Sequence, residues 1–75
     1  MVKVYTTDAC PWCIKAKNYL NSRNIAFEEL NVAEDIIARE EMLEKSKQMG
    51  VPVLDINGTV IVGFDKPAID TALTK

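Results

Sequence analysis

The sequence contains no histidine, and this single absence excludes several kinds of site. A Ser-His-Asp triad, a Cys-His pair, an imidazole metal ligand and a histidine pH switch all need the missing side chain. No apolar run approaches the roughly 18 consecutive residues of a membrane span, and the chain starts without a recognisable signal peptide. We therefore expect a cytoplasmic protein that does not contact the membrane.

Charge of neither sign predominates. Nine Lys and Arg residues face eleven Asp and Glu residues, the net charge is −2, and the two signs are interspersed along the chain. A nucleic-acid binder normally has a basic patch or stripe, so we expect no nucleic-acid partner. Seventy-five residues leave room for one domain, predicted over residues 1–75 and predicted to be a monomer.

Cysteine is scarce, and the two that occur, Cys10 and Cys13, are separated by only two residues. A secreted disulfide scaffold needs several bridges, whereas one bridge across four residues contributes roughly 2 kcal/mol. A structural zinc site needs four ligands, which this pair cannot supply within one chain. Two possible roles remain for the cysteine pair: redox chemistry, or binding of a metal shared between two chains.

Apolar periodicity and turn residues predict seven elements in the order β-α-β-α-β-β-α. Strands are expected over Val2–Thr6, Ile25–Leu30, Val53–Ile56 and Thr59–Val62. Helices are expected from about Cys10 to Asn21, over Glu34–Gln48, and after a cap at Asp65. Asn57-Gly58 predicts a two-residue type I′ hairpin between the last two strands.

This order predicts an α/β fold with a central mixed sheet and helices on both faces. The first β-α-β unit should be parallel and right-handed, and the last two strands should be antiparallel. In the helix expected over Glu34–Gln48, we predict that Ile36, Ile37, Met42 and Leu43 form the buried side.

The Cys10-Pro11-Trp12-Cys13 segment carries the predicted chemistry. Residues three apart on a helix have Cβ atoms about 5–6 Å apart, close to disulfide geometry. The unpaired amides and the dipole at the helix start should stabilise a thiolate on Cys10, while Cys13 should be more shielded. We predict that Cys10 attacks a disulfide and that Cys13 resolves the mixed disulfide. Pro11 should stiffen the loop, and Trp12 should offer an exposed aromatic surface to a partner.

One alternative stands beside this prediction. The cysteines could be an inert buried pair, although Pro11 at the helix start would then have no packing purpose. Lys15 and Lys17 could add positive potential near the sulfurs, but for Lys17 we favour a solvated helix face.

Several segments together make the whole chain resemble a glutaredoxin. They are Val4-Tyr5-Thr6, Cys10-Pro11-Trp12-Cys13, Gly50-Val51-Pro52 and Gly63-Phe64-Asp65. The chain is most similar to short prokaryotic glutaredoxin-like proteins of the YruB type, which lie close to the NrdH-type redoxins. The resemblance implies a thioredoxin fold with strands in the spatial order second, first, third, fourth, and thiol–disulfide oxidoreductase activity.

The resemblance also implies a substrate site. Pro52 would be a cis-proline facing the cysteines, and Val51 would pair its backbone with an incoming peptide or glutathione. Asp65 would reach the amino group of glutathione as well as cap the last helix. The substrate- or glutathione-binding residues expected on this basis are Pro11, Trp12, Val51, Pro52, Gly63, Phe64 and Asp65.

The chain departs from the glutathione-using pattern at three positions. Thr7 stands where a basic residue is usual, Gly50 where threonine is common, and Lys66 where many members carry a second aspartate. Gly63-Phe64 is similar to NrdH-type redoxins, which take electrons from thioredoxin reductase. Glutathione and a thioredoxin-reductase-type flavoenzyme are therefore both expected as possible electron donors.

The resulting expectation is a small dithiol oxidoreductase with no bound cofactor and no metal, acting on disulfide-containing proteins or glutathione mixed disulfides. The alternative is an iron–sulfur or soft-metal module in which Cys10 from each of two chains holds the metal. Pro11 and the bulky Trp12 should crowd such a shared cluster.

Overall fold

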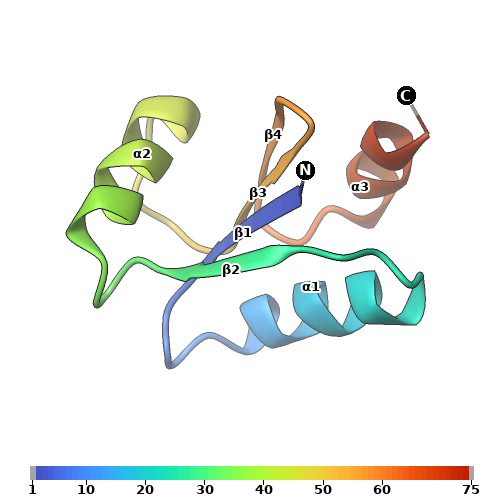
Figure 1. The fold of residues 1–75 in the computed structure, drawn as a ribbon, viewed down its shortest axis with the longest axis horizontal. Helices are drawn as coiled ribbons and strands as arrows, with labels where there is room; N and C mark the ends of the chain where they lie inside the picture. The colour runs from blue at the N-terminus through green and yellow to red at the C-terminus, as the bar shows by residue number, and fades with distance from the viewer. Residues whose placement is uncertain (1, 75) are drawn as a thin grey trace.

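The computed structural model describes residues 2–74, so the predicted domain bounds at Met1 and Lys75 lie outside the described residues. The element order is the predicted one (Figure 1). The elements are β1 (Val2–Thr6), α1 (Pro11–Ser22), β2 (Glu28–Asn31), α2 (Ile36–Ser46), β3 (Val53–Ile56), β4 (Thr59–Val62) and α3 (Lys66–Leu73). No helix within residues 2–74 combines the length and the apolar character needed to cross a membrane.

The four strands form one sheet in the order β2-β1-β3-β4, which confirms the expected arrangement. β1 and β2 are parallel, whereas β3 is antiparallel to both β1 and β4. The β3–β4 turn has positive φ at Asn57 (52°) and Gly58 (97°), as a type I′ turn requires. β2 and β4 are consequently the two edge strands.

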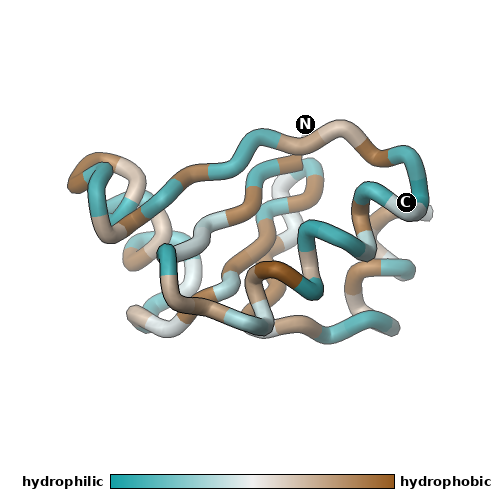
Figure 2. The backbone as a smooth tube through the Cα atoms, turned by 90° about the horizontal axis from the view of Figure 1, so that it is seen from below, coloured by the Kyte–Doolittle hydropathy of each residue, from teal (hydrophilic) through white to brown (hydrophobic). Residues whose placement is uncertain are grey.

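Helices cover both faces of the sheet, because alternate strand residues point to opposite sides. Val4 and Leu54 face α1 and α3, where Leu20 and Ile69 complete an apolar core. On the other face, a smaller set of buried apolar residues packs beneath α2: Tyr5, Val32, Ala38, Met42 and Val53. Figure 2 shows hydrophobic and hydrophilic stretches alternating along the strands.

Two elements, β2 and α2, differ from their predicted bounds. β2 begins at Glu28 rather than Ile25, because the Ile25 amide donates to the Leu20 carbonyl (3.0 Å) and stays with the end of α1. α2 is shorter than Glu34–Gln48. The Asp35 side chain accepts from the Ala38 amide (3.0 Å) and caps the helix start, and Lys47 ends the helix in the left-handed region (φ 61°).

The predicted buried side of α2 is correct only for Met42. Ile36, Ile37 and Leu43 are 68%, 78% and 43% exposed, whereas Met42 and Ala38 are buried. The isoleucines of the first turn of α2 line an open groove beside β2 instead of packing in the core. The inward stripe is set instead by the four-residue spacing of Ala38 and Met42, beside the polar residues Glu41 and Lys45.

These polar residues form a cluster between α2 and the sheet. The hydroxyl of the fully buried Tyr5 donates to Glu41, and Lys45 Nζ donates to Asp55 Oδ2 (2.5 Å) and to the Tyr5 hydroxyl (3.2 Å). Lys3 reaches Glu41 from the sheet (3.4 Å). Within residues 2–74, every buried side-chain nitrogen and oxygen has a hydrogen-bond partner. The α2 face therefore combines apolar packing with a paired charge network.

Candidate redox site

Cys10 and Cys13 lie at the start of α1 and are joined by a disulfide, with their Cα atoms 5.2 Å apart. Cys10 is the N-cap of the helix, and Pro11 occupies the first helical position, as predicted. The Cys13 amide donates to Cys10 Sγ (3.1 Å). Cys10 is 7% exposed and Cys13 only 1%, so Cys10 is the sulfur-bearing residue nearer to solvent.

The helix start gives the two cysteines different electrostatic surroundings. Cys10 lies at the amide end of α1, where the helix dipole is positive, and the first turn holds no acidic residue to oppose it. Cys13 lies one turn further along the axis. When the disulfide is reduced, the amide end favours negative charge on Cys10 over Cys13. The lower exposure of Cys13 agrees with its predicted shielding, and the difference in ionisation between the two thiols stays a prediction.

A cavity of about 270 Å³ adjoins the disulfide segment through Trp12. Its other lining residues come from two distant segments of the chain: Val51, Pro52, Gly63 and Phe64. The Val51–Pro52 peptide is cis, and the Gly63 amide donates to the Pro52 carbonyl (2.8 Å), which ties the two segments together. The structure thus assembles five of the seven predicted binding residues into one groove with no charged lining residue.

The other two predicted binding residues do not line this groove. Pro11 begins α1. Asp65 caps α3, and its carboxylate accepts from the Ala68 amide (3.2 Å), so the predicted cap is confirmed. Phe64, next to Asp65, packs edge-on against Tyr19 with 5.9 Å between ring centroids. Contact between Asp65 and glutathione stays a prediction.

Two lysines of α1 have partners that the sequence analysis did not predict. Lys15 Nζ lies 4.5 Å from the centre of the Trp12 ring, and Trp12 is 55% exposed. The three-residue spacing of Trp12 and Lys15 is the sequence signal for this contact. Lys17 is not simply solvated, since it forms an ion pair with Glu29 of β2 (2.7 Å). That partner lies on another element, so helical spacing could not reveal it.

The metal alternative has no support in the arrangement of donors. Within residues 2–74, no group of three or more His, Cys, Asp or Glu side chains is placed to hold a metal ion. The Cys10 sulfur is bonded to Cys13, and in this state it is not available as a ligand for a cluster shared between two chains.

The family model and the similar proteins all point to glutaredoxins. The Glutaredoxin family model matches residues 2–61. An uncharacterized glutaredoxin-like 8.6 kDa protein in the rubredoxin operon of Clostridium pasteurianum is 55% identical over 75 residues, covering 100% of both chains. Glutaredoxin 3 of Escherichia coli K12 is 38% identical over 64 residues, covering 85% of this chain and 77% of that protein.

Solved structures share the fold. The thioredoxin-like protein BC3987 superposes with a TM-score of 0.90 at 32% identity, covering 96% of this chain and 99% of that one. NrdH-redoxin from Escherichia coli, described as glutaredoxin-like with a thioredoxin-like activity profile, superposes with a TM-score of 0.82 at 26% identity. That match covers 93% of this chain and 91% of the other. The thioredoxin-type architecture expected from the sequence is confirmed.

Proposed function

Because the chain belongs to the glutaredoxin family, we propose that it is a thiol–disulfide oxidoreductase in which Cys10 attacks and Cys13 resolves. The observation that carries this proposal is the placement of Cys10. Cys10 caps α1, and its sulfur accepts a hydrogen bond from the Cys13 amide. It is the more exposed of the two cysteines and is bonded to Cys13. The disulfide corresponds to the oxidised end of the reaction.

The reaction transfers two electrons and two protons in two exchange steps. The Cys10 thiolate attacks one sulfur of a substrate disulfide, forming a mixed disulfide and releasing the other sulfur as a thiolate that takes up a proton. Cys13 then loses its proton and attacks Cys10 Sγ, which breaks the mixed disulfide and releases the second substrate thiol. The product is the observed Cys10–Cys13 disulfide, and an electron donor must reduce it before the next cycle.

The groove beside the disulfide suits an extended protein segment as substrate. Val51, next to cis-Pro52, can pair its backbone with such a segment, while Trp12 and Phe64 offer aromatic contact area. Disulfide-containing proteins are therefore the proposed substrates. The chain itself supplies both reacting sulfurs, so no resident cofactor is needed.

For the electron donor, we propose a thioredoxin-reductase-type flavoenzyme in preference to glutathione. Glutathione carries two carboxylates and an amino group, yet none of the groove-lining residues is charged. Thr7, Gly50 and Lys66 replace residues typical of glutathione-using members. The likeness to the E. coli NrdH-redoxin, with its thioredoxin-like activity profile, supports the same donor.

A side-by-side assay of NADPH consumption tests both parts of the proposal. One arm contains thioredoxin reductase, the other contains glutathione and glutathione reductase, and insulin is the disulfide substrate. We expect consumption in the first arm and its loss in Cys10→Ser, whereas Cys13→Ser should stop at the mixed disulfide. NADPH consumption only in the glutathione arm would overturn the proposed electron donor. No NADPH consumption in either arm would overturn the proposed oxidoreductase activity.

The pH dependence of alkylation tests the role of Cys10 separately. The reduced protein should react with iodoacetamide at Cys10 well below the pH at which an ordinary thiol reacts, because the amide end of α1 stabilises the thiolate. A half-maximal rate at a pH near the free-thiol pKa of about 8.5 would contradict this.

A dithiol that reduces other disulfides needs a reducing compartment. We therefore propose that the protein acts in the cytoplasm, as a monomer.

A further inference from the structure

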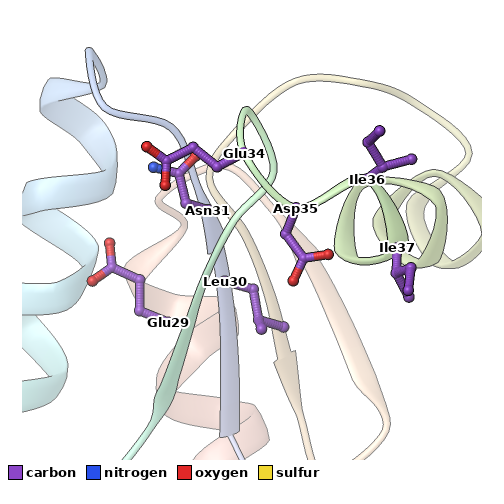
Figure 3. A pocket seen from close by; sticks show the side chains of 7 residues that line it. All are labelled: Glu29, Leu30, Asn31, Glu34, Asp35, Ile36 and Ile37. Carbon is purple, nitrogen blue, oxygen red and sulfur yellow. The ribbon is translucent and has the colours of Figure 1, made fainter.

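One edge of the sheet borders an open groove away from the disulfide. Among the strands of residues 2–74, β2 pairs only with β1, so its other edge has no neighbouring strand there. Beside this edge lies a groove of about 580 Å³, walled by β2, the turn that follows it and the first turn of α2 (Figure 3). An unpaired strand edge next to a groove is a place where another chain can add a strand.

The α2 side of the groove carries exposed apolar side chains. Leu30 of β2 and Ile36 and Ile37 of α2 line it, and the two isoleucines are 68% and 78% exposed. Figure 3 shows Leu30 directed toward the α2 side of β2. Neighbouring exposed apolar side chains are a mark of an interaction surface, and burying either isoleucine would be favourable.

The groove also carries three carboxylates, two of them on the other side of β2. Figure 3 shows the carboxylates of Glu29 and Glu34 on the α1 side of β2, and Asp35 between β2 and α2. Glu29 is paired with Lys17 (2.7 Å), and Asp35 accepts the Ala38 amide. No lysine or arginine of residues 2–74 forms an ion pair with Glu34. The groove therefore carries net negative charge.

We propose that this edge of β2 binds an extended segment of a partner protein in which cationic and apolar side chains alternate. Successive side chains of an added strand point to opposite faces, because the strand period is two residues. One face meets Glu29 and Glu34, and the other meets Leu30 and Ile37. A cation on one face and an apolar side chain on the other complement both sides of the groove.

Charge selects this occupant over two others. A second copy of the chain would place the carboxylates of two β2 edges against each other, and like charges at a strand edge oppose pairing. Nucleic acid would be repelled by the same carboxylates. A basic segment is attracted.

The docking edge lies beside the loop that precedes the disulfide. Asn31, at the end of β2, donates from Nδ2 to Asp8 Oδ1 (2.6 Å), and Asp8 stands two residues before Cys10. A partner held at β2 would thus lie against this end of the sheet. The binding itself does not depend on the sulfur chemistry, so Cys10→Ser should leave it unchanged.

A titration of the ¹⁵N-labelled oxidised protein, followed by NMR, tests the proposal. The probe is an acetylated and amidated hexapeptide of alternating lysine and valine. We expect shift changes in β2 and at Ile36 and Ile37, with no change in β4, the other edge strand. Screening by 0.5 M NaCl should weaken the binding severalfold.

Two matched peptides separate strand addition from general charge attraction. The same hexapeptide with glutamate in place of lysine should not bind. A version carrying N-methyl groups on the edge that would face β2 keeps its charge but cannot donate hydrogen bonds, and it should bind at least about tenfold more weakly. Equal binding by either control peptide would overturn the proposal.

Protein variants locate the surface. Ile37→Ser should lower the affinity about tenfold by removing an apolar contact, and Glu34→Gln should lower it about two- to fivefold. Val62→Ser is the matched control, since Val62 is 51% exposed on β4 and should have no effect. Unchanged affinity in Ile37→Ser, or a loss in Val62→Ser equal to it, would place the peptide elsewhere.

Discussion

Two clusters in the molecule use the same chemical parts in different surroundings. Each joins a tyrosine hydroxyl, a carboxylate and a cation: Tyr5, Glu41 and Lys45 beneath α2, and Tyr19, Asp70 and Arg23 between α1 and α3. In both, the tyrosine donates to the carboxylate and the cation reaches the tyrosine oxygen. The first cluster connects a helix to the sheet, and the second connects two helices at the surface.

Burial makes the difference between them. Tyr5 is fully buried, and burial together with the hydrogen bond to Glu41 raises the pKa of Tyr5 to about 12. Tyr19 is partly exposed, and its pKa is raised chiefly by the hydrogen bond to Asp70. Water can replace a lost partner at Tyr19 but not at Tyr5. The same set of groups should therefore contribute much more to stability beneath α2 than between α1 and α3.

Among the residues of the two polar clusters, the largest effect is expected for Lys45→Met. The change removes the ammonium group that donates to Asp55 Oδ2 (2.5 Å) and to the Tyr5 hydroxyl (3.2 Å). Both part-buried oxygens then lose this donor. We expect the free energy of unfolding, measured by urea denaturation, to fall by about 1–3 kcal/mol. Lys47→Met is the control, because Lys47 is exposed and forms no ion pair within residues 2–74. Equal losses in both variants would show that the cluster is not stabilising.

The next effect concerns alkaline stability. The folded state holds the Tyr5 proton to about pH 12, whereas the unfolded chain releases it near the ordinary value of 10.0. The folded state thus binds more protons in this window, so the contribution is complete below pH 10 and is lost as the pH rises toward 12. The urea midpoint of the native protein should decrease as the pH rises through this range. In Tyr5→Phe the decrease should be smaller. A fall of the same size in Tyr5→Phe would contradict the assignment.

Arg23→Met should have a smaller effect than Lys45→Met. Arg23 donates to Asp70 (2.6 Å) and to the Tyr19 hydroxyl (2.9 Å), but the pair is exposed to solvent that can replace it. We expect a small decrease in the thermal midpoint, which disappears in 0.5 M NaCl because salt screens the exposed pair. A salt-insensitive decrease in the thermal midpoint, as large as that of Lys45→Met, would contradict the proposed difference in stabilisation between the two clusters.

The smallest effect is expected on the outward side of α2. Ile36→Ser changes a residue that is 68% exposed, and the free energy of unfolding should move by no more than about 0.5 kcal/mol. Met42→Ala, on the inward side of the same helix, should cost about 2–5 kcal/mol. Thermal or urea denaturation of both variants measures the contrast. A costly Ile36→Ser would restore the original prediction that Ile36 is part of the core.

Sequence patterns predicted the parts of the fold that depend on neighbouring residues. Pro11 at a helix start, Asn57-Gly58 in a hairpin and Asp65 at a helix cap act within a few residues, and each occupies its predicted position. The cis bond before Pro52 was implied only by family resemblance, because a proline at a strand start is also compatible with a trans bond. Local chemistry was therefore sufficient for the element order and for the placement of the cysteine pair.

Features that depend on distant contacts were missed. The polar stripe of α2 is half-buried. Glu41 accepts from Tyr5, which is 36 positions away, and no local pattern indicates that pairing. The apolar pattern predicts that Ile36 and Ile37 are in the core, although both are exposed. Helical spacing likewise predicts a solvated Lys17, because its partner Glu29 belongs to another element.

Trp12 gives the site a built-in optical reporter. It is the only tryptophan in the chain, stands between the two cysteines and has Lys15 Nζ 4.5 Å from its ring centre. Indole emission from this protein therefore originates next to the disulfide, and nearby disulfides quench such emission. Opening the sulfur–sulfur bond, or covering the indole with a bound chain, should change the brightness or wavelength of the emitted light, so turnover can be watched in real time without an added dye.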